Sequence, residues 1–415
     1  MPGKALSKPR RYLSKTNLRI AWDNSVRSGK NYSTPGIDRQ RGRDFAKNLD
    51  SNLTNIARDV ADGTYRFQKL KCCWVPKRGE SNKERLICIP TVRDRLVQRA
   101  VVEALEEKDK LRLSNKVSFG FQKGLGVKNA IARAIQLRSN RRWYVKTDIS
   151  SFFDKIHREK LIEKFERRGP RSLVPLITQM IACEVKAEGD SDESKMEAQG
   201  IVVGRGIRQG MPISPLLSNL ELSSFDRKVV RANMHMVRYA DDLIFFCATK
   251  DETLKTLHQV KLWLKEVGHD IPDLQPGSKT NWGSPNESVE FLGLDIWFDK
   301  EVEKYAARIP EKSISRIVQE TRANATLDFC KKEKLDLVKF IMNLNSRGSS
   351  YYSVYKNASN LDDFKHRFEH ARRDALQRLL TELLGEETLK RLSKDNFKWA
   401  FFGLQNILSQ QDEPN

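Results

Sequence analysis

The sequence is poor in cysteine, and none of its cysteines has the spacing of a metal site. The six cysteines form no Cys-x-x-Cys pair, and several lie in apolar runs, where a thiol acts as a small hydrophobe. We therefore expect neither a zinc site nor a disulfide framework. A reducing compartment suits this pattern.

Membrane and targeting signals are also missing. The first residues, MPGKALSKPRRYLSK, have no apolar core of the kind that a signal peptide needs. No apolar run is long enough to span a bilayer, and there is no internal repeat or long low-complexity segment. We expect a soluble cytoplasmic protein without a membrane partner. A length of 415 residues suits two or three domains.

Acidic residues are in the minority. The chain has 54 Asp and Glu against 75 Lys and Arg, a formal net charge of +21, and 39% hydrophobic residues. Such an excess predicts a positive surface that holds a polyanion, with an affinity that falls steeply with salt. The alternative is a basic protein without a nucleic-acid partner.

Hydrophobic periodicity predicts a mixture of strands and helices. Strands are expected in 68–76, 85–90, 142–149, 234–247 (as strand, tight turn, strand) and 288–298. Helices are expected in 92–112, from about 158, in 213–231, in 251–268 and from Pro310 onward. Asp251 suits the N-cap and Gly268 the C-terminal stop of the 251–268 helix. The acidic segment 187–199 is expected to be an exposed loop or hairpin tip.

Three aspartates that lie next to apolar predicted strands are the candidate catalytic residues. Asp148 ends one predicted strand, and Asp241 and Asp242 occupy the turn between two others. Three converging carboxylates repel one another unless cations separate them, and hard divalent cations take oxygen ligands. Two metals can activate an attacking hydroxyl and stabilise a leaving pyrophosphate, as nucleotidyl transfer requires. An isolated Asp-Asp pair would more often be ordinary turn chemistry.

The residues around these aspartates resemble the motifs of reverse transcriptases. Tyr239–Asp242 (YADD) resembles the YxDD box, Lys146–Asp154 resembles the first palm motif, and Gly206–Asn219 resembles the QG…SPxLxN motif, in the family's order. The resemblance implies an α+β, right-hand polymerase fold, with fingers, a palm of antiparallel sheet backed by helices, and an α-helical thumb. It implies two Mg²⁺, with Mn²⁺ as the alternative, on Asp148, Asp241, Asp242 and the Ile149 carbonyl.

The same resemblance implies a nucleotide pocket. Phe153 matches an aromatic steric gate that rejects a 2′-hydroxyl, and Gln209 matches a residue that contacts the incoming nucleotide. Lys77 and Arg85 flank a fingertip hairpin and suit a triphosphate, and Lys279 matches a Lys that neutralises or protonates the pyrophosphate. The alternatives are a core Phe, a polar residue that caps a helix, and solvated surface cations.

Further positions are implied to contact primer and template. Tyr239 belongs to the YxDD box, and Leu292 and Gly293 lie in a stretch that resembles the primer grip. The expected domains are an N-terminal extension with fingers in 1–140, a palm in 141–305 with finger elements near 160–205, and a thumb in 306–415.

Two segments, TPGID at 34–38 and IPTVRDRLVQ at 89–98, are similar to the bacterial lineage related to group II intron enzymes. A compact chain without Cys/His endonuclease motifs resembles the stand-alone, defence-associated members of that lineage. This implies copying of a structured non-coding RNA in antiviral defence, with a DNA primer or product strand and dNTPs. The alternatives are an intron maturase, template-independent or protein-primed synthesis, an RNA polymerase, and an RNA-binding splicing factor. The oligomeric state is not predicted.

Overall fold

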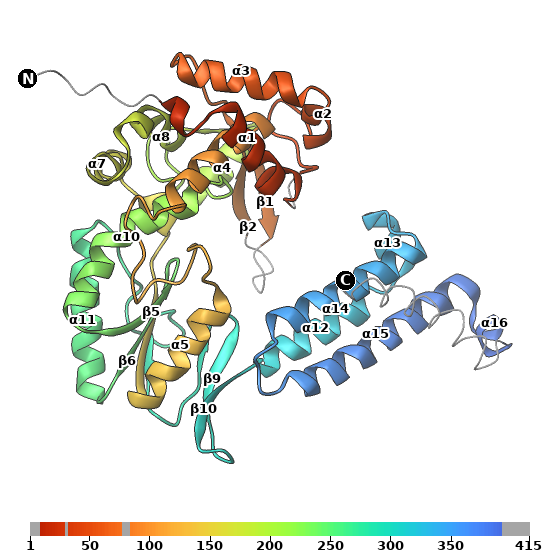
Figure 1. The fold of residues 1–415 in the computed structure, drawn as a ribbon. Coiled ribbons are helices and arrows are strands. Elements are labelled where there is room, and N and C mark those ends of the chain that lie inside the picture. The colour runs from red at the N-terminus through yellow and green to blue at the C-terminus, as the bar shows by residue number, and fades with distance from the viewer. Residues whose placement is uncertain (1–8, 30–31, 77–83, 392–415) are drawn as a thin grey trace, which may run out of the picture. The chain divides into compact units, whose positions relative to one another are not determined.

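The structure is a computed structural model that describes residues 9–29, 32–76 and 84–391 (Figure 1). The chain divides between Pro285 and Asn286 into two compact units. The strands β8–β10 belong to the second unit, whereas the expected boundary between 305 and 306 lies within β10. The assignment of fingers, palm and thumb to residue ranges stays a prediction.

The first unit combines helices with two small sheets. Its helical segments are η1 (Pro9–Arg11), α1 (Lys15–Ala21), η2 (Trp22–Arg27), α2 (Gly42–Ala46), α3 (Leu49–Ala61), α4 (Val92–Glu106), α5 (Val127–Asn140), α6 (Phe152–Lys155), α7 (Arg158–Arg168), η3 (Arg171–Leu173), α8 (Val174–Ile181), α9 (Asp190–Ala198), α10 (Ser214–Arg231) and α11 (Lys250–Glu266). Its strands are β1 (Leu70–Pro76), β2 (Glu84–Ile89), β3 (Trp143–Asp148), β4 (Val185–Lys186), β5 (His235–Tyr239), β6 (Asp242–Cys247) and β7 (Asn281–Gly283).

The larger sheet of this unit has the strand order β5-β6-β3-β7, and all of its neighbouring strands are antiparallel. The central strand β6 reads as a continuous apolar run because Leu243 to Cys247 are all buried. Helix α5 packs on β5 and β6, and α11 packs on β3 and β6 (Figure 1). These helices hold the ends of β3, β5 and β6 in place.

The smaller sheet has the order β2-β1-β4. Strands β1 and β2 form the expected antiparallel hairpin, and β4 adds to β1 in parallel. Helix α4 follows directly after β2, and the side chain of Thr91 caps it by accepting a hydrogen bond from the Asp94 amide at 3.1 Å. One hydrophobic core runs from α1 and α3 through α4 to α10 and the larger sheet, so both sheets rest on the same core.

The second unit contains an antiparallel sheet in the order β10-β9-β8 and a set of helices. Its elements are β8 (Val289–Phe291), β9 (Leu294–Asp299), β10 (Lys304–Arg308), α12 (Glu311–Ala323), α13 (Leu327–Glu333), α14 (Leu337–Val354), α15 (Leu361–Leu384) and α16 (Glu386–Arg391). A separate apolar cluster includes Phe340, Leu344 and Leu379 from α14 and α15.

Two local predictions are wrong. Residues Asp190–Ala198, expected in a loop or hairpin tip, form helix α9, and the acidic side chains in its first turn favour a helix N-terminus. All of α9 is nevertheless exposed or half-buried, as expected. Helix α11 is capped by Thr249, whose side chain accepts from the Glu252 amide at 3.2 Å, and Asp251 lies inside the first turn.

Candidate active site

The turn between β5 and β6 lies beside the end of β3. Asp148 and Asp242 are directly opposite each other in the β3–β6 pairing, and Tyr239 is opposite Asp242 in the β5–β6 pairing. Ala240 and Asp241 form the two-residue turn, in which Ala240 has a φ of 58°. The Ile149 amide donates to the Asp241 carbonyl oxygen at 3.2 Å. Two distant stretches of sequence therefore place their aspartates at one end of the sheet.

The carboxyl groups of Asp148 and Asp241 act on each other. Burial, together with the charge of Asp148 and a side-chain hydrogen bond with it, raises the pKa of Asp241 to about 7. The charge of Asp242 acts in the same direction. Such a site disfavours two negative charges unless a positive group lies between them.

One positive group is already present. The Lys279 ammonium hydrogen-bonds to Oδ2 of Asp148. Partial burial opposes protonation, but this hydrogen bond and the charges of Asp148, Asp241 and Asp242 raise the pKa of Lys279. The loop that carries Lys279 is fixed to β3, because the hydroxyls of Thr147 and Thr280 hydrogen-bond at 2.7 Å.

Converging carboxylates are suitable ligands for a divalent cation, which would relieve their repulsion as the Lys279 ammonium does at Asp148. Within residues 9–29, 32–76 and 84–391, however, no group of three or more His, Cys, Asp or Glu side chains is arranged to hold a metal ion. The structure therefore brings together the pair Asp148 and Asp241. A ligand role for Asp148, Asp241, Asp242 and the Ile149 carbonyl stays a prediction.

A buried arginine, which the sequence motifs did not indicate, supports the acidic turn. Arg238 makes a bidentate ion pair with Asp226 (Nε to Oδ1 at 2.8 Å and Nη2 to Oδ2 at 2.6 Å). Its Nη1 donates to the Ala240 carbonyl oxygen at 3.0 Å and to Asn219 Oδ1 at 3.1 Å, and Nη2 donates to Ser118 Oγ at 2.7 Å. In the sequence, the feature that could have indicated this role is the charged Arg238 in strand β5, which leads into the turn.

A tight glycine contact adds to this support. A Cβ on Gly120 would lie 2.5 Å from the Ala240 amide nitrogen, so only glycine fits beside the turn. The side-chain amide of Asn219, a member of the Gly206–Asn219 motif, donates to the Gly120 carbonyl oxygen at 2.9 Å. This motif and the acidic turn are therefore linked through one polar network.

The Gly206–Asn219 motif also contacts the β1–β2 hairpin. The Cys88 amide on β2 donates to the Gln209 carbonyl oxygen at 2.7 Å. Gly210 has a φ of 102°, and a Cβ there would lie 2.6 Å from the Cys88 carbonyl oxygen. The side chain of Gln209 is half-buried, and Arg85 is exposed on the same strand β2. Lys77 lies outside the described residues.

The two phenylalanines after Asp148 differ in environment. Phe152 is buried, and its ring lies edge-on to Phe153, with centroids 5.4 Å apart, and to His269, with centroids 5.0 Å apart. Phe153 is only half-buried, and its carbonyl oxygen accepts from the Ile207 amide at 2.9 Å. Phe152 is therefore the core residue of the pair. A role for Phe153 as a gate stays a prediction.

The predicted primer-grip residues form a tight turn. Leu292 and Gly293 connect β8 and β9, with φ values of 52° and 81°, which is the conformation of a two-residue hairpin turn with positive φ at both positions. This turn belongs to the second unit.

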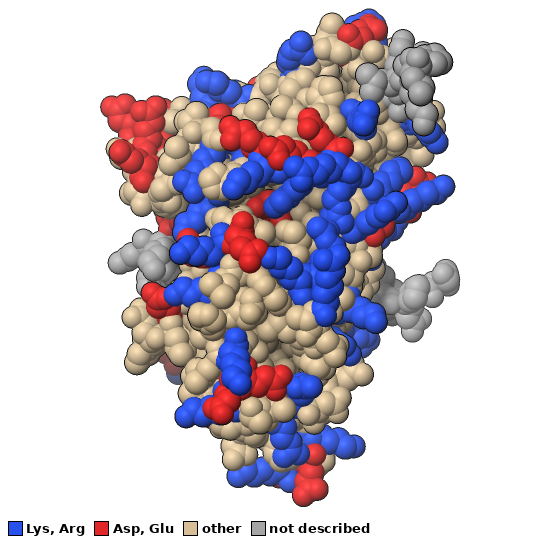
Figure 2. All heavy atoms as spheres, turned by 90° about the vertical axis from the view of Figure 1, so that its left-hand side faces the viewer, with Lys and Arg blue, Asp and Glu red and all other residues tan. Residues whose placement is uncertain are grey.

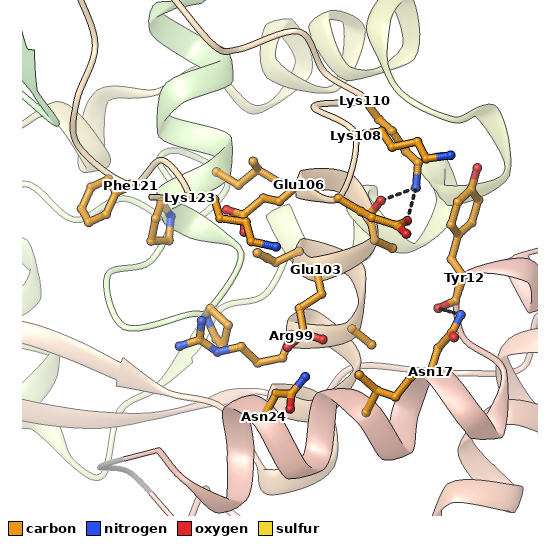
Figure 3. Close-up of a pocket in the computed structure, with 18 of the residues that line it drawn as sticks. Tyr12, Asn17, Asn24, Arg99, Glu103, Glu106, Lys108, Lys110, Phe121 and Lys123 are labelled. Carbon is orange, nitrogen blue, oxygen red and sulfur yellow. Dashed lines mark hydrogen bonds and ion pairs between the residues drawn. The ribbon is translucent and has the colours of Figure 1, made fainter. Parts of the chain in front are cut away.

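A large cavity borders the Gly206–Asn219 motif (Figure 3). Its volume is about 1040 Å³, and Pro212, Pro215 and Phe121 line one part of it. The ring of Phe121 lies 6.3 Å from that of Tyr239. Elsewhere the lining mixes cations with three glutamates, Glu103, Glu106 and Glu107.

An α+β fold with an antiparallel sheet that presents an acidic turn, followed by helices, defines a right-hand polymerase. The sequence profile of the family "Reverse transcriptase (RNA-dependent DNA polymerase)" matches residues 75–296, more than half of the chain, and the chain belongs to this family. The matched region contains every predicted site residue, from Lys77 to Gly293. Members of the family generally depend on a divalent metal.

Curated relatives agree with this assignment. Protein YkfC of Escherichia coli (strain K12) is 30% identical over 210 residues, which are 48% of this chain and 51% of YkfC. Group II intron-encoded protein LtrA of Lactococcus lactis subsp. cremoris is 27% identical over 269 residues, 65% of this chain and 41% of LtrA. The chain thus spans about half the length, or less, of the curated relatives it matches.

Among solved structures, the chain is similar to a telomerase from Candida albicans in complex with a TWJ fragment of telomeric RNA. The TM-score is 0.42 and the sequence identity 12%, over 84% of this chain and 65% of that one.

Across the described part of this chain, no helix has the length and apolar character needed to cross a membrane.

Proposed function

We propose that this protein is an RNA-directed DNA polymerase that extends a DNA primer with dNTPs by two-metal nucleotidyl transfer. The observation that carries the proposal is the convergence of Asp148 and Asp241 inside the region that matches the family. In this proposal an N-terminal extension and the fingers comprise 1–140, the palm comprises 141–305 with finger elements near 160–205, and the helical thumb or C-terminal domain comprises 306–415.

The pair Asp148 and Asp241, with Asp242 and the Ile149 carbonyl, would hold two divalent cations, Mg²⁺ or alternatively Mn²⁺. When bound, the cations would supply positive charge that favours deprotonation of the primer 3′-hydroxyl and stabilises the leaving pyrophosphate. The Lys279 ammonium, whose proton is retained by its contact with Asp148, would neutralise or protonate the pyrophosphate.

The remaining residues would orient the substrates. Gln209 is held against strand β2, which carries Arg85, so both can reach a nucleotide bound beside that strand. Arg85, with Lys77, would bind the triphosphate, since a guanidinium binds phosphate oxygens in a bidentate manner. Phe153 would exclude a 2′-hydroxyl by shape. Tyr239, and the Leu292–Gly293 turn, would contact primer and template.

The proposal is tested by primer extension with separate dNTP and rNTP pools on an RNA template, on a DNA template of the same sequence, and without a template. We expect extension with dNTPs that requires a template and proceeds on RNA. Extension only with rNTPs would instead indicate an RNA polymerase. Synthesis that ignores the template would indicate a terminal transferase, and synthesis that proceeds without the nucleic-acid primer would indicate a protein-primed enzyme.

For the biological role we propose copying of a cognate structured non-coding RNA in bacterial antiviral defence. The segments TPGID and IPTVRDRLVQ resemble the group II intron-like lineage. Because defence-associated reverse transcriptases resemble members of that lineage, this resemblance supports the proposed role. The alternative is a group II intron role, which the name of the relative LtrA favours. Sequencing of the RNA that co-purifies with the protein separates them, because intron RNA would contradict the defence role.

A further inference from the structure

A second cavity, of about 410 Å³, lies between α7 and α10 in the first unit. Its lining is basic and polar, and consists of Lys164, Arg167, Arg168, Ser223, Ser224 and Arg227. Figure 2 faces the side on which α7 and α10 lie, and Lys and Arg side chains gather across the middle of that face. None of these residues belongs to the candidate active site.

Two of the cations are neutralised locally. Lys164 contacts the buried carboxylate of Glu221 at 2.6 Å, and Arg167 pairs with Glu163 at 3.1 Å. In contrast, Arg168, Arg227 and the nearby Arg112 have no carboxylate partner within 4.0 Å in the described part of the chain. We call these three residues the arginine cluster.

Arg168 is held in place at the centre of the cluster. Its Nη1 donates to Ser223 Oγ at 2.7 Å, and its Nη2 donates to the Arg112 carbonyl oxygen at 3.2 Å. Burial lowers the pKa of Arg168, and repulsion from Arg227 and Arg112 lowers it further. Asp109 opposes this effect, but its carboxylate accepts hydrogen bonds from two backbone amides rather than from an arginine.

A buried hydroxyl beside the cluster also lacks a partner. Ser224 lines the cavity, and its Oγ is buried and makes no hydrogen bond with the described residues. A buried donor of this kind costs free energy unless a ligand or water satisfies it. One held and two exposed positive charges, next to one unsatisfied hydroxyl, together suit an anion with several oxygen acceptors.

Two alternatives to an anion site at the arginine cluster fit the observations less well. Cations in the last turn of a helix complement its dipole, which explains Arg168 in the last turn of α7 but not Arg227, which precedes the last turn of α10, or Arg112, which lies outside the helices. The larger cavity of Figure 3 is less suited to a polyanion, because Glu103, Glu106 and Glu107 line it. The arginine cluster has no such acidic lining.

We propose that the arginine cluster binds backbone phosphates of folded RNA outside the primer–template duplex. This inference rests on the proposed function, which supplies an RNA substrate. Along α10, Arg227 lies thirteen positions after Ser214 of the Gly206–Asn219 motif, or about 20 Å at ~1.5 Å per residue. An RNA longer than the copied segment can therefore reach the cluster while its template strand occupies the candidate active site.

The test compares wild-type protein with the double variant Arg112→Gln/Arg227→Gln, both exposed side chains without a hydrogen bond in the described residues. Lys255→Gln/Lys265→Gln on α11 removes the same charge and serves as the control. Binding of a long, structured RNA is measured against salt concentration. We expect the arginine variant to bind about tenfold or more weakly, with a log–log salt slope reduced by about 1.4 to 1.8, at 0.7 to 0.9 per lost phosphate contact.

Two further measurements separate this site from the catalytic one. Extension of a short primer on a short RNA template should be unchanged in the arginine variant, whatever the polymerase activity proves to be. Competition by a DNA hairpin and by inorganic phosphate distinguishes folded RNA from phosphate in general. Equal loss of RNA binding in the control, unchanged RNA binding, equal competition by the DNA hairpin, or loss of short-template extension would each overturn the proposal.

Discussion

All five N–H donors of Arg238 have an acceptor, and two of the acceptors are the carboxylate oxygens of Asp226. Both side chains are buried, so the pair is shielded from solvent and salt. Because Arg238 also holds the Ala240 carbonyl, it is a positioning residue for the acidic turn. Arg238 therefore contributes both to the stability of the sheet and to the position of Asp241.

Asp226→Ala leaves the Arg238 guanidinium buried without its counter-charge. We expect a loss of about 3 to 5 kcal/mol in the free energy of unfolding, measured by urea denaturation. Primer extension should also fall at temperatures where the variant is still folded, since the turn is no longer fixed. The control is Asp273→Ala, which removes an exposed ion pair with Lys261 and should leave both properties unchanged. Equal stability of both variants would contradict the account.

Phe153→Ala tests the predicted gate. Removal of the half-buried ring should raise the incorporation of rNTPs relative to dNTPs, because the space under the sugar would then admit a 2′-hydroxyl. The measurement is the ratio of kcat/KM values for dCTP and rCTP. If Phe153 only packs against Phe152, the melting temperature will fall and the sugar selectivity will stay as in wild type.

Among single residues, the sequence was informative where chemistry constrains the residue type. Asp148 and Asp241 could be proposed because they lie next to apolar strands and the residues around them resemble family motifs. Arg238 was missed because its role depends on Asp226 and Ser118, which are remote in sequence. Periodicity shows that a strand is buried, but it does not show which polar group completes a buried arginine.

At the scale of elements, the contact between the Gly206–Asn219 motif and strand β2 depends on Gly210. Gly210→Ala adds a methyl group that collides with the Cys88 carbonyl oxygen at a φ of 102°. We expect the motif to move away from β2 and the KM for dNTPs to rise about tenfold or more, since misplacement by about 1 Å is costly.

The control for Gly210→Ala is Gly63→Ala at the end of α3. Gly63 also has a positive φ, of 71°, but a Cβ there would meet nothing within 4 Å. Both variants place an alanine at a positive φ, but only in Gly210→Ala does the added Cβ collide with a neighbouring backbone atom. A similar KM in the two variants would contradict a nucleotide-positioning role for this contact.

Strands and helices with clear hydrophobic periodicity were predicted correctly, including the β1–β2 hairpin, α10 and the β5–β6 hairpin. Helix α9 was missed because it buries no apolar face and therefore shows no helical periodicity. The start of α11 was placed too late because Thr249 and Asp251 are both good N-cap residues, and composition alone does not choose between them.

At the scale of the whole molecule, the net charge of +21 predicts strong dependence of nucleic-acid binding on salt. We expect the dissociation constant for an RNA–DNA primer–template to rise by about 10³- to 10⁵-fold between 50 and 200 mM salt if about six to ten phosphates are contacted. Fluorescence anisotropy at several salt concentrations measures this slope. A flat dependence would show that the basic surface does not contact the backbone.

The most direct test of the central claim is single-turnover primer extension on an RNA template by wild-type protein and by Asp241→Asn. This substitution keeps the shape of the side chain and removes the charge that the proposed metal site needs. The account predicts that the variant melts at or above the wild-type temperature, because repulsion with Asp148 is relieved, and extends the primer at least about a thousandfold more slowly. Extension within tenfold of the wild-type rate by the folded variant would contradict it.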